Sequence, residues 1–259
     1  MFHKISSDQA LQYHVIISWV MYFFIFFFSF LGYYLNKNYK ETNYIKNISI
    51  FLIIFCVFQE VFDHLNRFFL DSNYSVSWQK DLPIHFCHLA FYFSLLAIYY
   101  QIKNNKINGY HHFLFCSSYL LGLTGALQGI LTPDFTDINN FIGVLSGQLQ
   151  HSLIILNVFW LIFAYKMTID FKGVIYTYLF INFIVPIAIF INYFLGYNLK
   201  GESANYLYVM ELPDVDNFLV NMIAQHPFPN FILYAQPLIL VYVIILYIPF
   251  LIKNFRLKS

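Results

Sequence analysis

Long apolar runs bounded by charged residues constrain this chain more than any other feature. Seven of them lie at 11–35, 45–70, 84–101, 112–131, 144–165, 173–196 and 232–252. Each is close to the roughly 20 apolar residues that a helix needs to cross a hydrocarbon core about 30 Å thick. Only 10% of the residues are charged, whereas a soluble domain has about a quarter. The sequence therefore predicts an all-α transmembrane bundle of about seven spans.

The runs leave little chain for anything but short connections. We expect a single transmembrane domain over 1–259, in a multi-pass integral protein of the cell membrane. The one long connection, 197–231, is interpreted as a partly ordered external loop. Its acidic residues are Glu202, Glu211, Asp214 and Asp216. The net charge of +1 and the lack of a basic cluster give no indication of nucleic-acid binding.

Lysine and arginine predict the orientation of the bundle. With seven crossings, ten of the fourteen basic residues fall on one side. These are Lys37, Lys40, Lys46, Lys103, Lys106, Lys166, Lys172, Lys253, Arg256 and Lys258. The positive-inside rule makes that side cytoplasmic, so the N-terminus is expected outside and the C-terminus inside. Eleven of the thirteen acidic residues fall on the outer side or in outer span ends; Glu41 and Asp170 are the exceptions.

Ionisable residues gather where the second run ends. Asp63 and Arg67 are four residues apart, as are Glu60 and His64, so each pair shares a helix face. Ionisable groups at membrane depth are costly and suggest function when they cluster. The alternative interpretation is an internally paired helix end that emerges into water.

The third run begins with a cysteine between two histidines. Cys87 is preceded by His85 and followed by His88, and Pro83 suits the first turn of a helix. A thiol near a helix N-terminus is favoured as thiolate. The other cysteines, Cys56 and Cys116, fall in mid-run, where a thiol behaves as a small hydrophobe. An inert buried residue is the alternative for Cys87 as well.

The next runs add polar groups at the same predicted level. Gln128 lies near the outer end of run four, His151 near the start of run five and Asn192 near the end of run six. Run four also carries a stripe of small residues that permits close helix contact, namely Gly122, Gly125, Ala126 and Gly129. The sequence thus predicts one polar site that opens to the outer surface or outer leaflet.

Several chemistries fit such a site. A cysteine with a histidine as base can take an acyl group as a thioester and pass it on, while amide N–H groups stabilise the oxyanion. A metal-dependent membrane hydrolase is an alternative, because the cluster has enough His and Cys residues for zinc, although no HExxH-like spacing occurs. A non-catalytic lipid- or ligand-binding protein or sensor is another. A transport path is the least favoured, because the inner halves of the runs are mostly apolar.

Four segments resemble the YwaF family of bacterial integral membrane proteins, which is related to the vertebrate transmembrane protein 164 family of lipid acyltransferases. They are 82–87 (LPIHFC), 122–134 (GLTGALQGILTPD), 148–151 (QLQH) and 192–198 (NYFLGYN). The resemblance implies a seven-span fold and phospholipid acyl transfer through a cysteine that matches Cys87, with His151 as the matching histidine. This chain departs from the family pattern at Gln150, where a small residue is common, and at His88.

These observations give one working hypothesis. The chain is predicted to be a membrane-embedded acyltransferase or acyl hydrolase that acts on a phospholipid or lipidated substrate and needs no cofactor. Cys87 is the expected nucleophile and His151 the expected base. The residues expected to position or bind the substrate are His85, His88, Gln128, Asn192, Glu60, Asp63, His64 and Arg67. The partners are membrane phospholipids as acyl donor and acceptor.

Overall fold

The computed structural model describes residues 4–39, 43–103, 108–135, 138–213 and 218–256. Its helices are α1 (Ser7–Asn38), α2 (Tyr44–Leu65), α3 (Phe86–Lys103), α4 (Gly109–Leu121), α5 (Leu127–Leu131), α6 (Phe141–Tyr165), α7 (Phe171–Leu195), α8 (Phe218–Ile223) and α9 (Asn230–Arg256). Two π-helical turns, η1 (Asn66–Leu70) and η2 (Gly122–Ala126), and one 3₁₀ turn, η3 (Tyr206–Tyr208), complete them. No strand occurs in these ranges. Lys40, Glu41, Lys106, Asp214, Asp216 and Lys258 lie outside the described residues.

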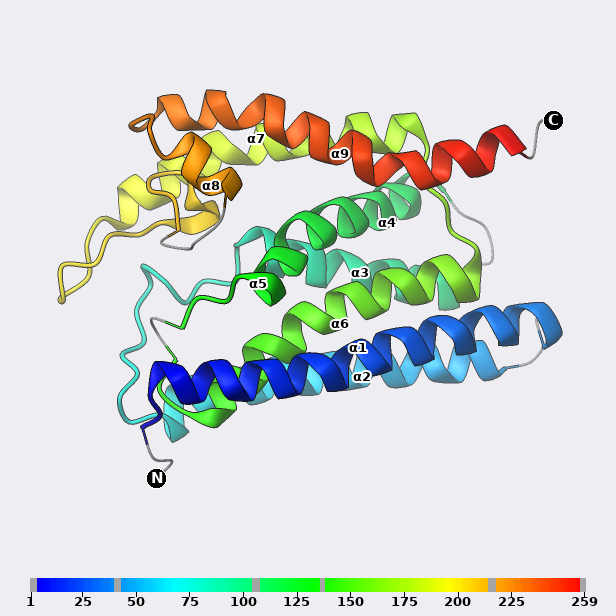
Figure 1. Cartoon of the computed structure of the whole chain (residues 1–259), viewed down its shortest axis with the longest axis horizontal. Coiled ribbons are helices and arrows are strands. Elements are labelled where there is room, and N and C mark those ends of the chain that lie inside the picture. The colour runs from blue at the N-terminus through cyan, green and yellow to red at the C-terminus, as the bar shows by residue number, and fades with distance from the viewer. Residues whose placement is uncertain (1–3, 40–42, 104–107, 136–137, 214–217, 257–259) are drawn as a thin grey trace.

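The long helices run back and forth along one axis, and the two termini lie at opposite ends of the molecule (Figure 1). Within the described residues, six helical stretches are long and apolar enough to cross a membrane. They are Ser7–Asn38, Tyr44–Leu70, Gly109–Leu131, Phe141–Tyr165, Phe171–Leu195 and Asn230–Ile252. The predicted all-α, polytopic membrane fold is confirmed.

The span count is about six instead of the predicted seven, and α3 makes the difference. This helix has 18 residues, and His88, Gln101 and Lys103 lower its mean hydropathy. It nevertheless packs inside the bundle against α2, α4 and α6. All seven predicted runs are helical, with ends within a few residues of the predicted ones.

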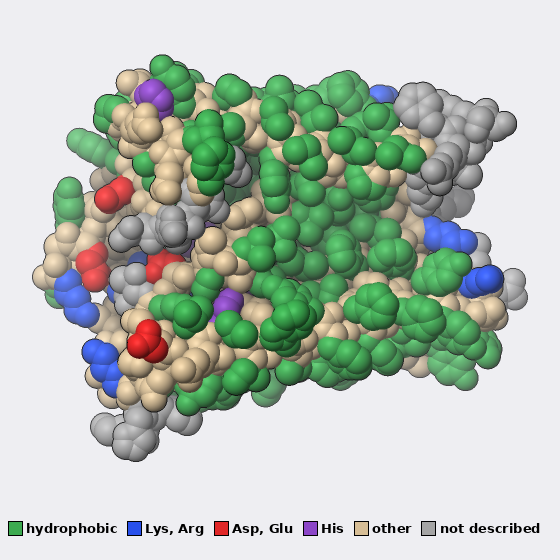
Figure 2. Space-filling model, viewed as in Figure 1, with side chains coloured by type: hydrophobic (Ala, Val, Ile, Leu, Met, Phe, Trp, Pro, Cys, Tyr) green, Lys and Arg blue, Asp and Glu red, His purple; other side chains and the backbone are tan. Residues whose placement is uncertain are grey.

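Helix α6 lies at the centre of the bundle, where it contacts α1, α2, α3 and α4. In the apolar 18-residue segments of α6 and of Gly109–Leu131, 67% of the residues are buried inside the bundle. The corresponding share is 22% for α1 and α7 and 11% for α9. The outer helices therefore present aromatic and aliphatic side chains such as Phe26 and Phe190, as expected of lipid-facing surfaces. Figure 2 shows this hydrophobic cover over the middle of one face, with acidic and histidine side chains toward one end. The orientation in the membrane stays a prediction.

Buried polar bonds join α2, α3 and α6 at several depths. Asn157 donates to Ser94 Oγ at 3.1 Å, and Trp160 donates to Ser49 Oγ at 2.8 Å, both deep in the bundle. Inter-helix hydrogen bonds of this kind stabilise bundles in lipid, where no water replaces them. The few polar side chains at this depth are thus paired with one another inside the bundle.

The start of α3 also differs from the prediction. The helix begins at Phe86, and the carbonyl of His85 accepts the first helical hydrogen bond, from Leu89 N at 3.0 Å. Pro83 therefore lies in the preceding loop and not in the first helical turn. The reason is tertiary, because Tyr206 Oη accepts a hydrogen bond from Leu82 N at 2.8 Å and holds this loop against the 196–213 segment.

The segment after α7 is ordered by local turns and by contacts to the bundle. Gly196 ends α7 at φ +59°, a left-handed conformation that suits glycine. Beyond it, Tyr197 and Ser203 form an isolated antiparallel bridge, followed by η3 and α8. The predicted external loop 197–231 thus contains short helices in its described part.

Candidate active site

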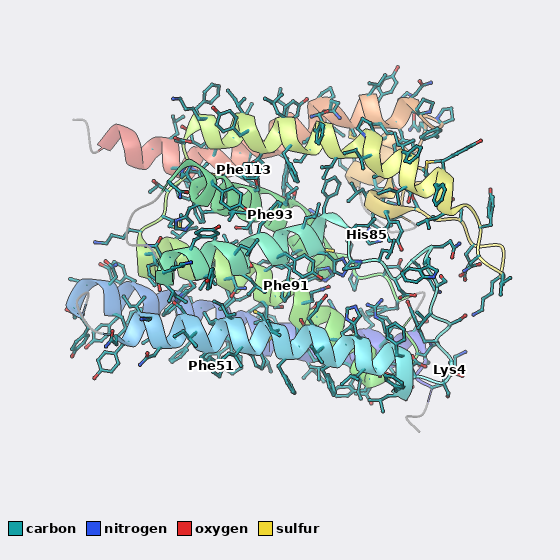
Figure 3. The ribbon with its side chains drawn as sticks, turned by 180° about the vertical axis from the view of Figure 1, so that it is seen from behind. Lys4, Phe51, His85, Phe91, Phe93 and Phe113 are labelled. Atoms are coloured by element: carbon teal, nitrogen blue, oxygen red, sulfur yellow. The ribbon has the colours of Figure 1, made fainter. Side chains whose placement is uncertain are left out.

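A cavity of about 580 Å³ lies at the end of the bundle where the 71–85 and 196–213 loops meet. Six of the predicted site residues line it: Cys87, His151, His85, His88, Gln128 and Arg67. The other four, Glu60, Asp63, His64 and Asn192, do not. Figure 3 labels His85 at this end of the bundle, beside the start of α3. The structure therefore brings the predicted nucleophile and the predicted base to one cavity.

Cys87 is the second residue of α3. At this position its backbone N–H is among the first four of the helix, which have no intrahelical acceptor, and the helix dipole favours a negative charge. Its side chain is partly buried. A Cβ at Gly125 would stand 3.9 Å from Cys87 N, in ordinary contact, so η2 passes directly beside the start of α3.

His151 packs against Gly129, four residues further along the same chain segment as Gly125. A Cβ at Gly129 would stand 2.6 Å from Cε1 and 2.9 Å from both ring nitrogens of His151. Only glycine leaves room for the imidazole in this orientation. The predicted close packing of the small-residue stripe is therefore seen at Gly125 and Gly129, which hold Cys87 and His151 on neighbouring turns.

The stripe includes a π-helical turn. η2 spans Gly122–Ala126 between α4 and α5, and such turns occur often at functional sites because they change which residues face a neighbour. A Cβ at Gly122 would lie 2.7 Å from Ile154 Cγ2, so α6 approaches this segment closely at both of its ends. The segment from Gly122 to Leu131 is the scaffold of the cavity floor.

His14 also lines the cavity and was not predicted from the sequence. It comes from α1, and its Nε2 lies 2.8 Å from the carbonyl oxygen of Ile130. A histidine inside an otherwise apolar run was the only signal for it. That signal was weak, because a lone histidine in a helix is usually a hydrogen-bonded core residue.

Glu60 joins three helices beneath the cavity. Its carboxylate accepts hydrogen bonds from Tyr92 on α3 at 3.1 Å and from Gln150 on α6 at 2.9 Å. Glu60 thus holds Gln150, which is the departure from the family pattern noted above and the residue that precedes His151. Glu60 acts here through Gln150, and no direct contact with His151 is seen among the described residues.

Ion pairs at the end of α2 tie the 71–85 loop to the bundle. Arg67 lies 2.9 Å from Asp63 and 3.3 Å from Asp81. This contact matches the internally paired helix end given above as the alternative interpretation. His64 Nδ1 lies 2.9 Å from the carbonyl of Glu60. His64 and Asp63 line a separate cavity of about 20 Å³, enough for one water molecule.

Tyr206 packs against His85, which lines the cavity, and was also not predicted from the sequence. Its ring lies 5.2 Å from that of His85, and its hydroxyl donates to Trp78 O at 2.7 Å. Burial raises the pKa of Tyr206 to about 12, so it stays a neutral donor. Asn192 binds the backbone of Tyr206 through both amide atoms, at 2.8 and 3.0 Å. The structure therefore gives Asn192 the role of holding this loop.

His85 and His88 each have a buried Nδ1 without a hydrogen-bond partner among the described residues. Their rings are 6.1 Å apart. Unpaired buried polar atoms are uncommon, and in a cavity they suggest that a ligand or water completes the site.

A salt bridge at the rim links the two loops. Lys80 lies 3.5 Å from Glu202. The hydrogen bond that Asn198 donates to the exposed Glu202 carboxylate lowers the pKa of Glu202, and Lys80 lowers it further. Lys80, like Arg67 and Asp134, thus adds an ionisable side chain to the lining of the cavity.

Neither of the other cysteines lines the cavity. Cys56 is fully buried and accepts a hydrogen bond from Asn157 at 3.4 Å. Cys116, also fully buried, contacts His112 near the opposite end of the bundle. Among the described residues, no group of three or more His, Cys, Asp or Glu side chains is arranged to hold a metal ion, so the geometry gives no support to the metal-enzyme alternative.

Comparison with protein families decides the family. A model of the TMEM164 family matches residues 9–247. The chain belongs to the TMEM164 family. The predicted relation to this family is confirmed, and together with the six apolar helices it identifies a multi-pass integral membrane protein. Comparisons with curated proteins and with solved structures found no match.

The TMEM164 match includes every candidate residue named above, from His14 to Tyr206. The more specific YwaF naming is compatible with this match and stays a prediction.

Proposed function

We propose that the protein is a membrane-embedded, cysteine-dependent acyltransferase. One observation carries this proposal: Cys87 and His151 line the same cavity and pack against Gly125 and Gly129 of one helical segment. Membership of the TMEM164 family supports it. With the predicted orientation, the cavity opens toward the outer leaflet, which suits a phospholipid or lipidated acyl donor.

The first half-reaction forms a thioester. His151 takes the proton of the Cys87 thiol, and the sulfur attacks the acyl carbonyl of the donor. The C–S bond forms, the ester C–O bond breaks, and the leaving alcohol takes the proton from His151. Gln128 lines the cavity and is the candidate for orienting the carbonyl.

The second half-reaction passes the acyl group on. A hydroxyl of an acceptor lipid attacks the thioester, the C–S bond breaks, and Cys87 regains a proton. Water in place of the acceptor gives hydrolysis by the same steps.

A trapping experiment tests the proposal. Purified protein is incubated with a phospholipid that carries an alkyne-tagged acyl chain, and intact-protein mass and peptide mapping locate the adduct. We expect a tag on Cys87 that neutral hydroxylamine removes. Cys87→Ser is the matched variant, because an oxygen ester would resist hydroxylamine. Unchanged lipid conversion in Cys87→Ala would overturn the covalent mechanism.

A non-catalytic lipid-binding protein or sensor is the second candidate, and the unpaired Nδ1 atoms of His85 and His88 favour it. It predicts saturable binding of the tagged lipid without a covalent adduct. It also predicts the same affinity in wild-type protein and Cys87→Ser.

A further inference from the structure

His14 is buried within α1 but lines the same cavity as Cys87 and His151. Its side chain is 6% exposed. Because the carbonyl of Ile130 can only accept, the 2.8 Å contact means that His14 Nε2 carries the hydrogen. In the neutral ring, Nδ1 is then an acceptor, and no partner for it is seen among the described residues.

The ring of His14 is contacted by α5 and the loop that follows it, while α6 bonds to Ser18 one turn further along α1. Ser18 donates to the carbonyl of His14 at 2.7 Å and in turn accepts a hydrogen bond from Gln148 on α6 at 2.9 Å. The ring also meets the edge of Phe135, with 5.7 Å between centroids. A base whose second nitrogen is held by a fixed hydrogen bond has a defined tautomer.

His151 is held differently. It packs against Gly129, the residue before Ile130, and makes no hydrogen bond to any other described residue. Two imidazoles from different helices therefore meet consecutive residues of α5. One of them, His14, has its tautomer set by the backbone, whereas the other is positioned by packing alone.

We propose that His14 is a second base, which serves the acyl acceptor while His151 serves Cys87. This inference rests on the proposed acyl transfer. The acceptor hydroxyl gives its proton to His14 Nδ1 as its oxygen forms the new C–O bond with the acyl carbon. The C–S bond breaks, and the proton returns from His14 to the Cys87 sulfur, through His151 or water in the cavity. Both histidines end neutral.

The simpler role for His14 is structural, because Ile130 lies in the last turn of α5 and its carbonyl lacks an intrahelical partner. The substitution His14→Gln separates the two roles. Glutamine keeps an N–H donor at the ε position for Ile130 O but cannot take a proton. The matched control is His112→Gln, since His112 Nε2 also contacts a backbone carbonyl, that of Thr168 at 3.0 Å, outside the cavity.

The experiment measures the two half-reactions separately. A pulse of tagged phospholipid gives the rate of Cys87 acylation, and a chase with a lysophospholipid gives the rate of transfer. In His14→Gln we expect acylation within about twofold of wild type and transfer slower by at least about 100-fold. Hydroxylamine, which needs no base, should remove the acyl group at the wild-type rate. His112→Gln should match wild type in all three measurements.

Other results would overturn the inference. Transfer at the wild-type rate in His14→Gln would show that His14 is not a second base, and it would not affect the proposed acyltransferase function. Slowing of acylation, transfer and hydroxylamine cleavage together assigns His14 a purely architectural role. Absence of any acyl adduct on wild-type Cys87 rejects the proposed function itself, and this inference with it.

Discussion

Cys87 and Cys116 lie toward opposite ends of the bundle, and each has histidines nearby. Cys116 has the closer set of contacts: its sulfur is 3.6 and 3.7 Å from the two nitrogens of His112, which lies 3.8 Å from Asp170. Cys116 is nevertheless fully buried, and Asp170 caps α7 by accepting from Gly173 N at 2.7 Å. Cys87 lines a cavity of about 580 Å³.

The two cysteines differ in access and not in the presence of a nearby histidine. Nearly equal distances to both ring nitrogens place the Cys116 sulfur over the ring of His112 and not in line with a lone pair. No substrate atom reaches it without local unfolding. Access to a cavity is what separates Cys87 from Cys116, and the following predictions test that distinction.

The largest expected effect is on turnover when each cysteine is removed. Cys87→Ala should lower acyl transfer by at least about 1000-fold, because the covalent intermediate cannot form. Cys116→Ala should retain activity within about twofold when corrected for folded protein. Lipid mass spectrometry after incubation with mixed phospholipids measures both. Equal losses of acyl transfer in Cys87→Ala and Cys116→Ala would contradict a functional difference between the two ends of the bundle.

The histidines should show the same contrast with a smaller effect. His151→Gln should slow thioester formation by about 100-fold, the usual contribution of a general base. His112→Gln should leave this rate within about twofold. Single-turnover acylation of Cys87 is the measurement. A normal acylation rate in His151→Gln would assign the first base elsewhere.

Thiol modification tests access directly, without any assay of function. In folded protein in detergent, a maleimide should modify Cys87 at least about tenfold faster than Cys56 or Cys116. Each variant in which two of the three cysteines are replaced leaves one thiol, and its modification is followed by mass spectrometry. Denaturant should make the three rates similar. Faster labelling of Cys116 in the folded protein would contradict its burial.

Two glycines allow the smallest and most controlled test. Alanine at Gly129 would press on the His151 ring, and alanine at Gly173 would press on Cys116. Each change should lower the free energy of unfolding by about 1–3 kcal/mol, as expected of overpacking. Only Gly129→Ala should also slow acylation per folded molecule. Thermal unfolding in detergent measures the loss of stability, and single-turnover rates measure the acylation of Cys87. Slow acylation in Gly173→Ala would refute the assignment of the reaction to the Cys87 end of the bundle.

The sequence was sufficient for the helices, because length and hydropathy alone decide whether a segment suits a membrane. It also brought Cys87, His151 and Gln128 into one predicted site, since alternating spans bring their ends to a common level. It failed at the start of α3, where the contact from Tyr206 to Leu82, 124 residues apart, keeps Pro83 out of the helix. Local propensity contains no information about such a contact.

The polar residues at the ends of the helices show where sequence reasoning stops. Spacing predicted Glu60, Asp63, His64 and Asn192 near one end of the bundle. Only side-chain packing determined that Asp63 pairs with Arg67 and that Asn192 holds a loop. The sequence by itself determined a membrane bundle with polar groups at one end. The tertiary structure alone decided which groups face the cavity, and it added His14, because helix rotation depends on contacts between helices that are far apart in the chain.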